Sequence, residues 1–320
     1  MHRCWLSILF CLCLSATTHA QTLAELRRQL SEDLRQIQFV KSLNTLILVS
    51  DELELSGVNL DIDGDPDTDL RGFSIPFSRS FFTNDEASIG VHLEGAIGYA
   101  TARQQIADIY DGVAPAFATS VDTEWSSFGT IFGAGPTFRL APGLRLTFIG
   151  NVSLGRFENR TDYGGPGRAF SAALADGIAF NWDAVSAGYG GATRIDYQIE
   201  LAPDYLLETR ARYDLRYNHT FSGDDPAQEA SERAQILTLR ADLSGPTGLE
   251  LFGQPLRWKA TAGYRNFVEG TLFGVSNYVQ LGGGFEIPGV LPFDTGLNLQ
   301  AAYITGDSVE GYSLGAGLSF

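Results

Sequence analysis

The chain has 320 residues, of which 19% are charged and 44% hydrophobic, and its mean hydropathy is −0.02. Beyond the N-terminus no apolar run approaches the roughly 18 residues that a membrane helix needs, which excludes a helical membrane protein. The net charge of −16 argues against a general nucleic-acid binder, and the 21 Phe and 12 Tyr residues argue against intrinsic disorder.

Residues 1–20 have the layout of a cleaved secretory signal peptide. Arg3 precedes an apolar stretch from Trp5 to Leu14, and Thr18-His19-Ala20 offers a small-x-small cleavage site before Gln21. All three cysteines of the chain lie in this segment. The mature protein is therefore expected to be exported and to contain neither a disulfide nor a thiolate metal site.

Residues 21–42 are predicted to form an amphipathic helix. Thr22 and Glu25 have the spacing of an N-terminal capping box. Apolar residues then recur at helical spacing, at Leu23, Leu26, Leu30, Leu34 and Ile37.

From Val185 onward the chain alternates between apolar and polar residues for long stretches. Between Val185 and Leu201 the odd positions are mostly apolar, whereas even positions include Arg194, Asp196 and Glu200. This period of two predicts strands with one apolar and one charged face. The whole sequence contains twelve such segments, at 53–63, 70–82, 87–103, 122–139, 143–160, 178–201, 204–221, 232–244, 255–268, 272–287, 294–305 and 310–320.

The connectors between these segments alternate in length. Tight turns are expected at 84–86, 141–143 and 202–204, and longer connections near 104–121, 161–177 and 222–231. Short turns on one side and long loops on the other are typical of bacterial outer-membrane β-barrels. Twelve strands enclose a lumen too wide for side chains alone to fill. We therefore expect residues 43–320 to form an all-β, transmembrane antiparallel barrel with a polar lumen, the alternative being a secreted β-sandwich.

Aromatic residues near both ends of the strands are consistent with two interfacial belts. Those expected at the short-turn ends are Phe81, Phe82, Phe138, Tyr205, Trp258, Phe285 and Phe320. Those expected at the long-loop ends are Phe73, Tyr99, Trp125, Trp182, Tyr217 and Tyr264.

The last predicted strand ends in a phenylalanine, and this pattern resembles the signature that the outer-membrane barrel assembly machinery reads. Its residues are Tyr312, Leu314, Leu318 and Phe320. Twelve strands preceded by a helix resemble the translocator domain of autotransporters, in which a helix threads the lumen. The resemblance implies that residues 21–42 occupy the lumen of a solitary barrel without a passenger, in an outer membrane with lipid and lipopolysaccharide around it.

The even and odd positions assign many charged residues to the lumen. The cations are Arg139, Arg145, Arg194, Arg210, Arg212, Arg216, Arg240, Arg257, Lys259 and Arg265. The anions are Glu94, Asp196, Glu200, Glu208, Asp214, Asp242 and Glu286. They could form a weakly anion-preferring constriction. The other interpretation is a self-paired network that stiffens the barrel and holds the helix, since arginine can bridge carboxylates on neighbouring strands.

One acidic loop is a weak candidate for calcium, because hard cations favour several oxygen ligands. Its aspartates are Asp61, Asp63, Asp65, Asp67 and Asp69. No glutamate stands at the spacing of an EF-hand, so a solvated loop is the expected interpretation and we predict no metal and no cofactor.

Enzyme chemistry finds little support in the sequence. His92 and His219 are the two histidines outside the signal peptide, and His219 could form an acid–histidine dyad with Asp214, Asp224 or Asp225. No nucleophile motif accompanies either histidine. Residues 282–284 are three glycines within a predicted strand, which favours close backbone approach over a phosphate loop.

These patterns together predict a non-enzymatic outer-membrane barrel of a Gram-negative bacterium, acting as a restricted or plugged pore. Lipid, lipopolysaccharide and the barrel assembly machinery are the expected partners, and nucleic acid is not. The alternative is a surface-exposed adhesion or interaction protein that acts through its acidic extracellular loops.

Overall fold

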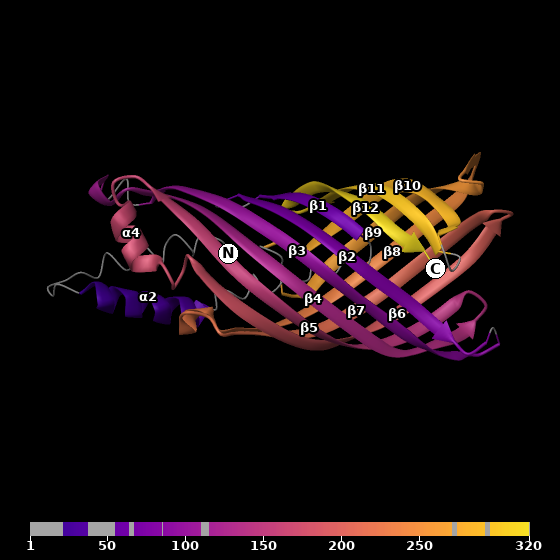
Figure 1. Ribbon diagram of the computed structural model, residues 1–320, viewed down its shortest axis with the longest axis horizontal. Helices are drawn as coiled ribbons and strands as arrows, with labels where there is room; N and C mark the ends of the chain where they lie inside the picture. Colours follow the sequence, from indigo (N-terminus) through magenta and orange to yellow (C-terminus); the bar gives the residue numbers. More distant parts are fainter. Residues whose placement is uncertain are drawn as a thin grey trace.

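The computed structural model describes residues 22–37, 55–63, 67–84, 86–109, 115–270, 274–291 and 295–319, in which twelve antiparallel strands close into one barrel (Figure 1). Each strand pairs with its neighbours in the chain, and β1 pairs with β12 to complete the ring. The strands are β1 (Leu55–Ile62), β2 (Thr68–Phe82), β3 (Ile89–Ile109), β4 (Thr119–Ala141), β5 (Leu144–Gly164), β6 (Trp182–Ala202), β7 (Tyr205–Phe221), β8 (Ala230–Leu251), β9 (Gln254–Glu269), β10 (Asn277–Leu291), β11 (Thr295–Gly306) and β12 (Val309–Ser319). The predicted signal peptide at 1–20 and the end of the predicted helix at 38–42 lie outside the described residues.

All twelve predicted strands are present, and the main differences lie at the strand ends. The third strand continues to Ile109 and the eighth to Leu251, beyond the predicted ends at 103 and 244. The sixth begins at Trp182 instead of 178, because the preceding connection contains a short helix that the alternation did not predict. The described residues also contain the helices α2 (Leu23–Ile37) and α4 (Arg168–Ala175) and the 3-10 turns η1 (Pro115–Phe117) and η2 (Pro226–Gln228).

Both α2 and α4 lie at the end of the barrel that carries the long loops, and the C-terminus lies at the other end (Figure 1). None of the described helices is long and apolar enough to cross a membrane.

The two faces of the sheet differ as the alternation predicts. On β2, the outward side chains of Phe73, Ile75 and Phe77 are about half exposed, whereas Ser74 between them is 1% exposed. Exposed apolar residues recur on the outer wall of other strands, such as Val152 on β5. An outer wall of this kind matches the hydrocarbon-facing band of a transmembrane barrel.

The glycines at 282–284 permit close approach of two strands, as expected. A Cβ atom on Gly284 would lie 2.0 Å from the carbonyl oxygen of Leu299, and one on Gly282 would lie 2.6 Å from that of Ala301. Any larger residue would therefore collide with the β11 backbone.

The aromatic belts are less complete than predicted, because three of the rings face inward. Trp182 is 3% exposed and packs against Trp125, with ring centroids 5.8 Å apart. Phe82 lies beneath the guanidinium of Arg139, which is 3.7 Å from the ring centroid. The parity of each position along its strand decides the face, and position near a strand end alone does not.

Candidate functional site

The N-terminal helix is part of a cap at the long-loop mouth. Its predicted capping box is present, since the backbone N–H of Thr22 donates to Glu25 Oε2 (2.7 Å) and that of Glu25 to Thr22 Oγ1 (3.3 Å). Leu30 and Leu34 are 1% and 7% exposed, and Leu26 packs beside them. Leu23, which belongs to the same predicted stripe, is 41% exposed.

Inward-facing apolar residues of the strands and the two loop elements complete the cap. They form one cluster with Leu30 and Leu34, which includes Leu60, Ile62, Leu70, Phe157, Leu174, Ile178, Trp182, Ala227, Ile236, Phe267 and Val309. The helix lies against α4 and η2 at this mouth. Its leucines find apolar partners here, whereas the inner wall nearer the short turns is charged, and this difference explains its position.

Two side chains of the helix form hydrogen bonds with the loops. Arg27 donates from Nη1 to the carbonyl oxygens of Ala173 (2.7 Å) and Leu174 (3.2 Å), and from Nη2 to that of Asp176 (2.8 Å). A guanidinium there satisfies carbonyls at the C-terminus of α4. The hydroxyl of Ser31 donates to Asp225 Oδ1.

The two loops are also joined to each other, because Gln228 is fully buried and donates to the carbonyl oxygens of Gly177 (3.0 Å) and Ile178 (3.2 Å). Asp225 accepts a hydrogen bond from the backbone of Ala227 (2.9 Å), which completes the turn at η2. Neither α4 nor Gln228 was predicted from the sequence.

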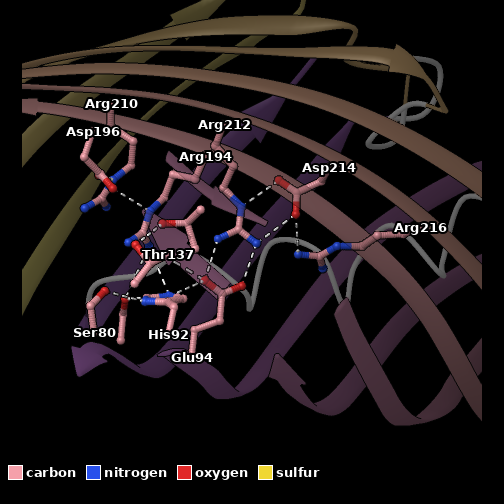
Figure 2. Close-up of polar contacts among 12 residues, drawn as sticks. Ser80, His92, Glu94, Thr137, Arg194, Asp196, Arg210, Arg212, Asp214 and Arg216 are labelled. Atoms are coloured by element: carbon pink, nitrogen blue, oxygen red, sulfur yellow. Dashed lines mark hydrogen bonds and ion pairs between the residues drawn. The ribbon is translucent and has the colours of Figure 1, made fainter. Parts of the chain in front are cut away.

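A charged network crosses the lumen nearer the short turns, and Figure 2 shows Arg212 between the carboxylates of Glu94 and Asp214. Arg212 on β7 donates to both oxygens of Glu94 on β3, at 2.8 and 2.7 Å. It also donates to both oxygens of Asp214, at 2.8 and 2.9 Å. All three residues are less than 7% exposed. Because β3 and β7 are not neighbours in the sheet, the Glu94–Arg212 contact spans the interior.

A second branch of the network lies on β6 and β7. Asp196 accepts from Arg194 Nε at Oδ2 and from Arg210 Nε at Oδ1, both at 2.8 Å. Arg216 Nη2 lies 3.3 Å from Asp214 Oδ1 and so joins the first branch. Bidentate and charge-assisted contacts of this kind fix side-chain geometry strongly.

His92 belongs to the network and is fully buried. Its Nδ1 lies 3.0 Å from Ser80 Oγ, and its Nε2 lies 3.3 Å from Arg194 Nη1 and 3.3 Å from Glu94 Oε2. His92 therefore links a guanidinium, which only donates, and a carboxylate, which only accepts, to the hydroxyl group of Ser80.

Other predicted lumen residues form a second, smaller group on β8 to β11. Arg240 Nε donates to Asp242 Oδ2 (2.8 Å), Lys259 Nζ lies 3.5 Å from the same oxygen, and Arg240 Nη2 reaches Gln300 Oε1 (3.2 Å). Thr261 donates to Asp242 Oδ1 (2.6 Å).

The remaining predicted charges have separate surroundings. Arg257 donates to the carbonyl oxygen of Asp204 (2.7 Å), and Arg265 lies 3.4 Å from the hydroxyl of Tyr278. Glu208 lies near Lys259, Asp242 and Glu286, while Glu200 is exposed at the short-turn end of β6. Arg139 and Arg145 face each other across β4 and β5.

The predicted acid–histidine dyad is not formed by the described residues. His219 lies on the exposed face of β7, where its Nδ1 is 3.0 Å from Ser231 Oγ, whereas Asp214 faces inward. Asp225 is engaged by Ser31 and the η2 turn.

The acidic loop does not form a metal site among the residues that the structure describes. Asp61, Asp63, Asp67 and Asp69 are exposed, and Asp65 lies outside the described residues. Within those residues, no group of three or more His, Cys, Asp or Glu side chains is arranged to hold a metal ion.

The C-terminal strand presents Tyr312 and Leu314 on the outer wall, at 54% and 60% exposed. Leu318 falls within β12, and Phe320 lies outside the described residues.

The fold belongs to the class of closed twelve-strand antiparallel barrels, and it is similar to the barrels of autotransporter translocators. The β domain of the Bordetella autotransporter BrkA matches with a TM-score of 0.52 and 18% identity, over 83% of this chain and 96% of that one. The transport unit of the autotransporter AIDA-I from Escherichia coli matches with a TM-score of 0.51 and 12% identity, over 91% of this chain and 99% of that one. At these identities the likeness concerns the fold alone.

No protein-family model matches the chain, and no curated protein matches it.

Proposed function

We propose that this protein is a non-enzymatic outer-membrane β-barrel of a Gram-negative bacterium that acts as a restricted pore, closed at rest by its own cap. The observation that supports this most directly is the insertion of Leu30 and Leu34 into an apolar cluster that strand and loop residues share at the long-loop mouth. Burial of two leucines stabilises such a closure by roughly 1.5–3 kcal/mol each.

The charged network forms a second barrier beneath the cap. Glu94, Arg194, Arg212 and Asp214 are less than 7% exposed, and each has an oppositely charged partner within 4.0 Å. Self-paired charges hold their geometry instead of binding passing ions. For this part of the lumen we therefore favour the interpretation of a stiffening network over that of an ion-selective constriction.

The outer wall supports contact with lipid and lipopolysaccharide. Above the apolar band, β3 to β6 carry outward ion pairs such as Arg103–Asp122 and Arg156–Asp183. Such pairs suit the headgroup region, where phosphates and sugars replace acyl chains. The outward Tyr312 and Leu314 of the last strand support recognition by the barrel assembly machinery.

The closed-pore proposal is tested by conductance of the refolded protein in planar bilayers. Leu30→Asp combined with Leu34→Asp places two charges in the apolar cluster and should raise the single-channel conductance several-fold. Deletion of residues 21–42 should have the same effect. The matched control is Leu23→Asp on the same helix, because Leu23 is 41% exposed. Equal conductance of wild type, double variant and deletion would refute closure by the cap.

An adhesion role through the acidic loop is the second candidate, because Asp61, Asp63 and Asp69 are exposed beside the long-loop end. Changing these residues to asparagine should abolish binding of whole cells to an abiotic or host surface without altering conductance. Unchanged binding would remove this candidate.

A further inference from the structure

One hairpin at the short-turn end extends past both of its neighbours. Among the described residues, β8 pairs with β7 only as far as Ser244, and β9 pairs with β10 only as far as Arg257. Residues 245–256 therefore form a two-stranded ribbon that projects from the barrel, drawn in orange at the end that carries the C-terminus (Figure 1). We call these residues the rim ribbon.

The outer face of β8 continues into the rim ribbon. Across the bulge between Pro246 and Glu250, β8 advances four residues while β9 advances two. An excess of two residues leaves the alternation of faces unchanged. Leu249 and Leu251 therefore share the outward parity of Leu239, which is 41% exposed on the outer wall.

The rim ribbon exposes three large apolar side chains, with Leu249 at 64%, Leu251 at 43% and Phe252 at 77%. Phe252 and Gly253 form the two-residue turn, with φ values of 55° and 75°. A hairpin turn with two positive φ values favours asparagine, aspartate or glycine, and a bulky residue there is a rare outlier. The neighbouring β6–β7 turn follows the rule, because Asp204 holds its positive φ of 68°. Turn geometry does not select phenylalanine, so the outlier points to an interaction of its side chain.

The base of the rim ribbon lies at the interfacial level of the barrel. Tyr205 and Trp258 pack there with ring centroids 6.3 Å apart. Gly245 lies against both rings, since a Cβ atom on it would be 2.9 Å from each. Aromatic pairs on the outer wall of a barrel mark the level of the lipid headgroups. The apolar face of the ribbon is thus continuous with the lipid-facing wall, which favours a phospholipid surface over a protein as its partner.

We propose that the rim ribbon lies in the headgroup region of the periplasmic leaflet and anchors the rim of the barrel to phospholipid through Leu249, Leu251 and Phe252. Burial of apolar side chains at the headgroup–acyl boundary supplies the attraction. This inference rests on the proposed outer-membrane barrel. It goes beyond the closed pore, because the ribbon lies at the end opposite the cap.

Site-directed spin labelling of the chain from Gln21 onward, refolded in phospholipid vesicles, tests this anchor. That part of the chain contains no cysteine, so each single-cysteine variant carries one label. Gln254→Cys reports on the ribbon and keeps its three apolar side chains. Asn84→Cys, at an exposed position in another short turn, is the water reference, and Val152→Cys on the outer wall is the lipid reference. Collisions with a water-soluble nickel chelate should be rare at residues 254 and 152 and frequent at residue 84.

The combined substitutions Leu249→Asn, Leu251→Asn and Phe252→Asn should raise the collision rate at residue 254 to that at residue 84, because the apolar contacts with lipid are lost. Glu250→Gln is the matched control within the ribbon and should leave the rate unchanged. Heat modifiability on a gel verifies that each variant is folded. Phe252→Asn alone, which suits the turn, should raise the rate in part.

A collision rate at residue 254 as high as that at residue 84, or no change in the triple variant, would overturn the proposal. Protection of residue 254 in native outer-membrane fragments but not in vesicles would assign the ribbon to a protein partner and would also overturn it. Failure of the outer-membrane barrel itself is distinguishable, because residue 152 would then be accessible as well. If the anchor alone fails, residue 152 stays protected.

Discussion

Replacement of Arg212 by methionine removes the central cation of the lumen network. Arg212 is the bidentate partner of both Glu94 and Asp214, and the side chains of all three are less than 8% exposed. Asp214 keeps Arg216 Nη2 at 3.3 Å. Among the described residues, the guanidinium then nearest to Glu94 is that of Arg194, at 3.9 Å, so the loss of ion-pair energy falls mainly on Glu94.

Breaking a buried ion pair by removal of one partner costs about 3–5 kcal/mol, because the other charge remains desolvated. We expect Arg212→Met to lower the free energy of unfolding by this amount. The additional substitution Glu94→Gln removes the stranded charge, so the double variant should be more stable than Arg212→Met alone. Arg156→Met is the control, since its ion pair with Asp183 is exposed and worth at most about 1 kcal/mol.

Equilibrium unfolding in urea, with the protein reconstituted in lipid vesicles, measures these differences. The buried Trp182 and the partly buried Trp125, which pack together at the long-loop mouth, provide the fluorescence signal. If the free energy of unfolding of Arg212→Met lies within about 1 kcal/mol of the wild-type value, the network does not stabilise the barrel, which refutes this prediction.

Three further perturbations address the cap and the sheet. Leu30→Ala should cost about 2–5 kcal/mol in the same urea titration because the side chain is fully buried, whereas Leu23→Ala at an exposed position should cost far less. Arg27→Gln should release the helix from α4, which is measured as faster proteolysis within residues 23–37. An unchanged cleavage rate would contradict this role of Arg27. Gly284→Val should abolish the heat-modifiable folded band, because its Cβ would meet the carbonyl oxygen of Leu299 at 2.0 Å, and a normal folded band would count against this.

The strands and the face that each residue occupies could be predicted from the sequence, because the period of two is a local property of extended chain. Arg194, Arg210 and Arg212 could be assigned to the inner wall from parity alone. All three do face inward, where Arg194 and Arg210 contact Asp196 and Arg212 contacts Asp214. The same parity places Trp125 and Trp182 on the inner wall, whereas their position near a strand end had suggested an outward-facing aromatic belt.

The local sequence pattern predicts the helix but not its position. The capping box of Thr22 and Glu25 and the leucine stripe could be predicted from the sequence, and both are present. An amphipathic stripe indicates that a helix packs against an apolar surface, but it does not identify that surface. The partners here are loop elements, α4 and η2, which carry no period-two signal.

Only the tertiary structure decided which charges meet. Glu94 and Arg212 are separated by 118 residues in the chain and lie on strands that do not pair. Their contact exists because β1 closes onto β12 and brings opposite walls within side-chain reach. The order and register of the strands also decide that Arg194 and Arg210 share the carboxylate of Asp196, because they determine which side chains are neighbours.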